Sequence, residues 1–104
     1  MFSATTIYEE NIMNNIIISY DLRNQRDYKT LIASINALGK ASQVLESLWY
    51  VKTSSTAMQC FDFLVETLDR DDGLAVFDCC HNQKEVRNPN NRDFERLWVN
   101  IIRE

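Results

Sequence analysis

The stretch 14–39, "NNIIISYDLRNQRDYKTLIASINALG", predicts a strand followed by a helix. Three successive isoleucines at 16–18 form the short apolar run typical of a central strand buried on both faces, which we expect over 15–22. After Asp27 the apolar residues recur at helical spacing, so Asp27 is suited to cap a helix and Gly39 to end it. The residues at this spacing are Tyr28, Leu31, Ile32, Ile35 and Leu38.

The next stretch repeats this order with an extra strand. Residues 41–53 are rich in Val, Leu, Trp and Tyr and predict two antiparallel strands joined near Glu46 and Ser47. Caps from Ser54, Ser55 and Thr56 then precede a helix, whose apolar stripe is core rather than a cofactor box. The stripe consists of Ala57, Cys60, Phe61, Leu64, Val65 and Leu68.

The segment "DRDDG" (69–73) predicts an exposed turn before a fourth strand at 74–77. Gly73 is expected to tolerate Val poorly if its φ is positive. The order βαββαβ predicts an α+β fold of the ferredoxin-like type, an antiparallel sheet with both helices on one face.

The C-terminal part adds a loop and one more helix. Residues 81–91 contain "NPNN" and predict a loop, after which Asp93 is suited to cap an amphipathic helix. Its apolar side consists of Phe94, Leu97, Trp98, Ile101 and Ile102. Because the second face of the sheet is otherwise bare, this stripe is buried either in a homodimer or by folding back over its own sheet, and both alternatives stay open.

The chain is therefore expected to have three parts: an N-terminal appendage (1–13), a ferredoxin-like domain (14–80), and a loop with a C-terminal amphipathic helix (81–104). With 104 residues and 45% hydrophobic residues it suits one ordered domain. No apolar run reaches the roughly 20 residues of a membrane helix, and the N-terminus lacks the basic start of a secretory signal. We expect a cytoplasmic protein.

Charge and cysteines limit the chemistry. A net charge of -4 excludes a strong general nucleic-acid binder, because such binding depends on Lys and Arg that neutralise phosphates. The three cysteines are expected to be reduced thiols. "CCH" (Cys79, Cys80, His81) gathers three soft ligands, but strand neighbours point to opposite faces and no second cluster completes a zinc site. A packed strand end is the alternative to metal binding there.

Three segments carry a resemblance to a family: "IIISYDLRNQRDYKTLIASINALG" (16–39), "LESLWYVKT" (45–53) and "LDRDDGLAVFD" (68–78). The chain resembles the small SinR-like proteins, which are similar to CRISPR-associated protein two and to virulence-associated protein D. The likeness covers about residues 14–79. Its most specific element is "SYDL" combined with "LWYVKT".

The resemblance implies a ferredoxin-like homodimer. Some members of the wider family are metal-dependent nucleases with an aspartate at the end of the first strand, near the dimer axis; others are structural parts of a DNA-integrating complex. By this resemblance Asp21 is the catalytic, metal-binding residue for Mg²⁺ or Mn²⁺, and Tyr20 and Arg23 contact nucleic acid. The alternative is that Asp21 caps the turn into the first helix. The segment "LRNQRDY" (22–28) has fewer basic residues than nuclease members show after this strand.

Two functions follow as hypotheses. The first is a metal-dependent endoribonuclease of a defence or toxin-antitoxin system, acting on RNA rather than DNA because the acidic chain cannot support wide duplex contacts. The second is a non-catalytic dimeric adaptor or scaffold that binds a protein encoded by a neighbouring gene through its sheet edges and C-terminal helix.

Overall fold

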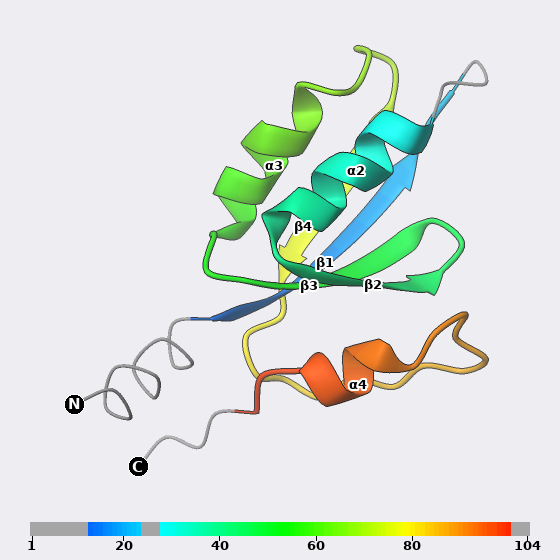
Figure 1. Cartoon of the computed structure of the whole chain (residues 1–104). Coiled ribbons are helices and arrows are strands. Elements are labelled where there is room, and N and C mark those ends of the chain that lie inside the picture. The colour runs from blue at the N-terminus through cyan, green and yellow to red at the C-terminus, as the bar shows by residue number, and fades with distance from the viewer. Residues whose placement is uncertain (1–12, 24–27, 101–104) are drawn as a thin grey trace.

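The computed structural model describes residues 13–23 and 28–100, which form a four-stranded antiparallel sheet with helices (Figure 1). The elements are β1 (Asn14–Asp21), α2 (Tyr28–Leu38), β2 (Lys40–Leu45), β3 (Leu48–Thr53), α3 (Ala57–Val65), β4 (Gly73–Asp78) and α4 (Asp93–Leu97). The sheet order is β2-β3-β1-β4. This α+β architecture is compatible with a ferredoxin-like fold. Expectations that concern residues 1–12, Asp27, Ile101 and Ile102 lie outside the described residues.

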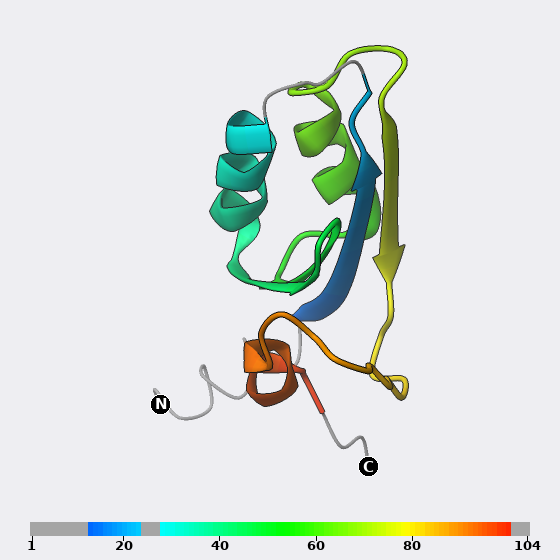
Figure 2. The same ribbon diagram turned by 90° about the vertical axis from the view of Figure 1, so that its right-hand side faces the viewer.

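The sheet is built around β1, which pairs antiparallel with both β3 and β4. Alternation along β1 sends Ile16, Ile18 and Tyr20 to the face that α2 and α3 cover, where all three are buried. Ile17 points to the opposite face, which we call the outer face. Figure 2 shows α2 and α3 on the same side of the sheet. The prediction of a central strand is confirmed; burial on both faces holds only in part, because Ile17 is half-buried and Asp21 is exposed on the outer face.

Helix α3 begins where its sequence predicts. Thr56 is the N-cap: its side chain accepts a hydrogen bond from the Gln59 backbone N–H at 3.1 Å, and the Gln59 side chain accepts one from the Thr56 N–H at 2.9 Å. This reciprocal capping box satisfies two backbone donors that the first turn leaves without helical partners. Cys60 and Leu64 are fully buried against the sheet.

The outer face is partly covered by the C-terminal segment. Phe94 and Trp98 pack on Val44 and Tyr50, and the Trp98 ring stacks on Tyr50 with centroids 5.4 Å apart. In Figure 1 the β2–β3 hairpin lies between α2 above and α4 below. The described part of the apolar stripe, Phe94, Leu97 and Trp98, thus folds back over its own sheet, which is one of the two alternatives that the sequence leaves open. The argument for a dimer from a bare face therefore loses its main basis.

A buried asparagine fixes this packing. The Asn15 side chain is fully buried; its amide group donates to the carbonyls of Cys80 at 2.7 Å and Val99 at 3.1 Å. Its oxygen accepts from the Tyr50 hydroxyl at 2.7 Å and from the Val99 N–H at 2.8 Å. The Leu97 carbonyl also lies 3.0 Å from the Tyr50 hydroxyl and shares the single proton of that hydroxyl with the Asn15 oxygen. Two of the four hydrogen bonds of the Asn15 side chain tie Val99 of the C-terminal segment to β1, and the other two join β1 to Cys80 and to Tyr50.

Two details of the C-terminal helix differ from expectation. Asp93 is not the cap: it is the first residue of α4, its own N–H donates to the Asn91 side chain at 2.7 Å, and the N-cap is Arg92, whose side chain makes no capping bond. The helix ends at Leu97 because Trp98 adopts an extended backbone (φ -57°, ψ 130°). That extended conformation lets the Val99 N–H and carbonyl reach Asn15.

The two described glycines are explained by the space around their Cα atoms and not by a positive φ. Neither described glycine has a positive φ, so the condition that we set for Gly73 is not met. Gly39 follows the end of α2 as expected, but for another reason: a Cβ there would collide with the backbone carbonyl oxygen of Lys52. Close backbone approach, and not a left-handed helix end, explains glycine at this position.

Ser42 provides a test of the outer face. Its Oγ is buried and has no hydrogen-bond partner among the described residues. Because an unpaired hydroxyl loses its water without compensation, we expect Ser42→Ala to leave the free energy of unfolding unchanged or to raise it by up to about 1 kcal/mol. Urea denaturation measures this. A loss of more than about 1 kcal/mol would mean that the hydroxyl has a partner, such as a buried water.

Candidate functional site

Asp21 lies at the end of β1 on the outer face, directly opposite Gly73 of β4. Its side chain is 71% exposed, and its one hydrogen bond within the described residues is a long contact of 3.4 Å from Arg23 Nη2 to Asp21 Oδ2. No backbone N–H of a described residue is capped by this carboxylate. A Cβ at Gly73 would lie 3.3 Å from the Asp21 Cβ, so glycine leaves room beside the aspartate.

Arg23 joins the end of β1 to the turn between α3 and β4. Its backbone N–H donates to Asp72 Oδ1 at 2.9 Å, and its guanidinium Nη1 donates to the Asp71 carbonyl at 2.8 Å. The same guanidinium contacts Asp21. The resemblance implies that Arg23 contacts nucleic acid; the structure places Arg23 beside Asp21 and gives it this structural role in the turn.

Tyr20 is not part of the same surface. Successive strand residues point to opposite faces, so Tyr20 faces the helices while Asp21 faces outward. Its side chain is buried, its hydroxyl donates to the Glu46 carbonyl at 3.3 Å, and it accepts from Trp49 Nε1 at 3.3 Å. Burial raises the pKa of the Tyr20 hydroxyl, and the bond from Trp49 opposes this. Tyr20 and Asp21 therefore do not meet at one site.

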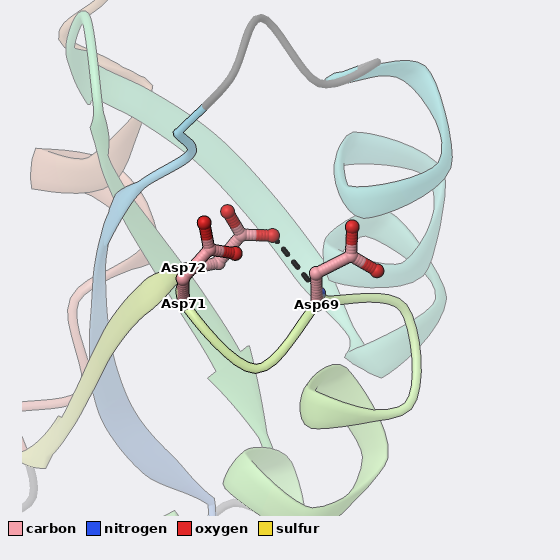
Figure 3. A group of neighbouring side chains, drawn as sticks. All are labelled: Asp69, Asp71 and Asp72. Carbon is pink, nitrogen blue, oxygen red and sulfur yellow. Dashed lines mark hydrogen bonds between the residues drawn. The ribbon is translucent and has the colours of Figure 1, made fainter.

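The turn after α3 gathers three carboxylates, those of Asp69, Asp71 and Asp72, with ligand oxygens within 4.8 Å of one another (Figure 3). Asp72 has a structural reason to be there: Oδ2 accepts from the Asp69 N–H at 2.9 Å and Oδ1 from the Arg23 N–H. The sequence predicted this turn as exposed and did not single out its carboxylates as ligands. An exposed acidic turn with backbone partners is not evidence of a bound metal.

The "CCH" segment lies where β4 ends. Cys79 is half-buried beside the cluster of the outer face, Cys80 is exposed with φ 52°, and the His81 Nδ1 lies 3.0 Å from the Val99 carbonyl. Burial raises the pKa of the Cys79 thiol, with smaller contributions from Asp78 and Cys80. Among the described side chains these three residues do not form a group that could hold a metal ion, and of the two thiols only that of Cys79 is packed.

Comparisons with protein-family models, with curated proteins and with solved structures gave no match to this chain. The resemblance to SinR-like proteins therefore stays an expectation from the residues quoted above. Within the described residues, no helix is long and apolar enough to cross a membrane.

Proposed function

We propose that the chain has the ferredoxin-like fold of the small SinR-like proteins, extended by its C-terminal helix, and that it acts as a homodimeric, metal-dependent endoribonuclease. The observation that supports this is the state of Asp21. Its carboxylate is 71% exposed at the end of a central strand, and its ion pair with Arg23 is long, at 3.4 Å, so the carboxylate is accessible to a cation.

The chemistry requires two chains. Hydrolysis of a phosphodiester needs a cation that neutralises developing charge and activates water. One carboxylate per chain is too little for a stable site, but two Asp21 side chains across a twofold axis can hold one Mg²⁺ or Mn²⁺, with water completing the octahedron. Part of the outer face along β4 is available for such a contact, because Ala75, opposite Ser19, is only partly buried and Phe77, opposite Ile17, is 57% exposed.

The test compares Asp21→Asn with the wild type in thermal melts and in cleavage of a single-stranded RNA oligonucleotide. Two carboxylates repel each other without a cation, so Mg²⁺ or Mn²⁺ is expected to raise the melting temperature of the wild type by several degrees and that of the variant not at all. Cleavage is expected to fall at least about 100-fold, because the cation is no longer held against the phosphate.

The chain offers a matched control. Asp93 forms a similarly exposed ion pair with Arg96, at 3.5 Å against 3.4 Å for the pair of Asp21. Asp93→Asn should keep both the cation effect and the cleavage. Identical melts with and without cation, together with no cleavage by the wild type, would rule out the enzyme. A strict monomer in light scattering at tens of micromolar, with the cation present, would contradict the shared site.

The second candidate is the non-catalytic dimeric adaptor of a defence or toxin-antitoxin system, which binds a protein from a neighbouring gene. The contacts of Arg23 favour it: this guanidinium donates to the Asp71 carbonyl and contacts Asp21, so it is less available to a phosphate. Co-expression with the neighbouring genes distinguishes the two candidates. If the chain is an adaptor, the wild type and the Asp21→Asn variant should co-purify equally well with the protein that the neighbouring gene encodes.

A further inference from the structure

Within residues 13–23 and 28–100, the edge of β4 that faces away from β1 has no pairing partner, in contrast to the protected edge on the β2 side of the sheet. At the other edge, β2 has an irregularity between Gln43 and Leu45, and the Asn90 N–H donates to the Val44 carbonyl at 2.8 Å. Bulges and bonds of this kind protect an edge against pairing with another chain. The edge of β4 has neither among the described residues, and Figure 2 shows β4 at the margin of the sheet.

An apolar groove adjoins this edge. The hollow between α3 and the beginning of β4 measures about 340 Å³, and four apolar side chains line it together with polar residues of the turn. The four are Phe61, Val65, Leu68 and Leu74. Phe61 and Val65 are 39% and 41% exposed. The strand itself, "GLAVFD" (73–78), has no proline and no charge before Asp78, so it lacks the residues that prevent strand addition.

The charge of this side identifies the partner's chemistry. Residues 57–78 carry six acidic side chains and one basic one, a net charge of -5 in a chain whose total is -4. The rest of the chain, with ten basic and nine acidic residues, is nearly neutral. The acidic residues are Asp62, Glu66, Asp69, Asp71, Asp72 and Asp78. Arg23 of the β1 end contacts this turn and offsets one of these charges, which leaves a net charge of -4 (-5 + 1). Such a surface repels phosphates and attracts a cationic partner.

We propose that the side of the molecule formed by α3 and β4 binds an extended, basic and apolar segment of another protein, which adds a strand to β4. Backbone hydrogen bonds along the edge supply affinity, apolar side chains enter the groove lined by Phe61 and Val65, and Lys or Arg side chains meet the acidic residues. A second copy of this chain fits poorly through this edge, because pairing two β4 strands brings two segments of charge -5 together.

This binding surface does not include Asp21, so the proposal holds whether or not Asp21 binds a metal. The probe is a fluorescein-labelled eight-residue peptide of alternating lysine and valine, titrated into the intact chain and followed by anisotropy. Two peptides serve as controls: glutamate with valine, and lysine with serine. We expect the lysine–valine peptide to bind at least about tenfold more tightly than either, and its affinity to fall with salt.

Variants and NMR locate the site. Phe61→Ser should weaken binding about tenfold, because it removes an apolar wall of the groove. Met58→Ser is the matched control, since Met58 lies on the same helix, is 73% exposed and does not line the groove. Its affinity should not change. Amide shifts on peptide addition should concentrate in 73–78, and the melting temperatures of both variants show whether they fold.

Three results would overturn the proposal: equal affinity for all three peptides, amide shifts outside β4 and α3, or displacement of the peptide by single-stranded RNA. Light scattering tests the remaining alternative, in which a second copy of this chain occupies the groove. If the free chain forms a dimer whose formation is blocked by Phe61→Ser, the groove is occupied by a second copy and the proposal of a different protein is wrong.

Discussion

Replacing Asn15 by Ala is expected to lower the free energy of unfolding by about 4 kcal/mol, because the substitution removes four buried hydrogen bonds and leaves buried partners unpaired. Val99 is buried, and its backbone N–H loses the acceptor that the Asn15 oxygen provides. The Tyr50 hydroxyl retains its bond to the Leu97 carbonyl. The melting temperature should fall by roughly 20 °C.

A second substitution separates the hydrogen bonds from the volume of the side chain. Asn15→Asp keeps the oxygen that accepts from Tyr50 and Val99, but its other oxygen faces two carbonyls, those of Cys80 and Val99. A carboxyl there is stable only in the protonated form, so folding raises its pKa. Stability is therefore greatest below the pKa of the unfolded chain and is lost as pH rises through the folded value. We expect a higher melting temperature near pH 4 than near pH 7, relative to the wild type.

Urea denaturation across this pH range measures both variants. Tyr50→Phe is the milder comparison, since it removes one of the two donors to the Asn15 oxygen and leaves the Val99 bond in place. It should cost about 1 to 2 kcal/mol. A loss of less than about 1 kcal/mol for Asn15→Ala would show that the buried network contributes little to holding the C-terminal segment on the sheet.

The strands, α2 and α3 could be predicted because their signals are local. The isoleucines of β1 and the capping box of Thr56 and Gln59 involve residues within a few positions of one another. The contacts of Asn15 could not, because its partners Cys80 and Val99 lie 65 and 84 positions away in the chain. An asparagine at the start of an apolar strand reads equally well as an exposed strand end, so the choice between a dimer and a folded-back helix stayed open.

The candidate site was predictable in part for the same reason. The position of Asp21 follows from the end of its strand. Successive side chains of a strand point to opposite faces, so the sequence already indicated that Tyr20 and Asp21 lie on different faces of the sheet. The link from Arg23 to Asp71 and Asp72 spans 48 and 49 positions and depends on how α3 returns the chain to β4. No local pattern indicates that an arginine after the first strand will bind this turn.

Gly39→Ala is expected to destabilise the protein by about 3 kcal/mol or more, because the new Cβ collides with the Lys52 carbonyl, a backbone atom that cannot rotate away. The approach is fixed on both sides: Lys40 pairs with Lys52 in the sheet, and the Thr53 hydroxyl donates to the Leu38 carbonyl at 2.7 Å. The φ of Gly39 is not positive, so the loss arises from the contact and not from a strained backbone at the alanine itself.

Gly73→Ala is the matched control for this steric argument. Its φ is not positive either, and the nearest atom to its new Cβ is the side-chain Cβ of Asp21, at 3.3 Å. A shift of a few tenths of an ångström relieves that contact, and alanine also lowers the entropy of the unfolded chain, so we expect a change within about 1 kcal/mol. Urea denaturation of the two variants side by side gives the comparison. Equal losses would contradict the argument, because they would show that the backbone around Lys52 yields as easily as the exposed side chain of Asp21.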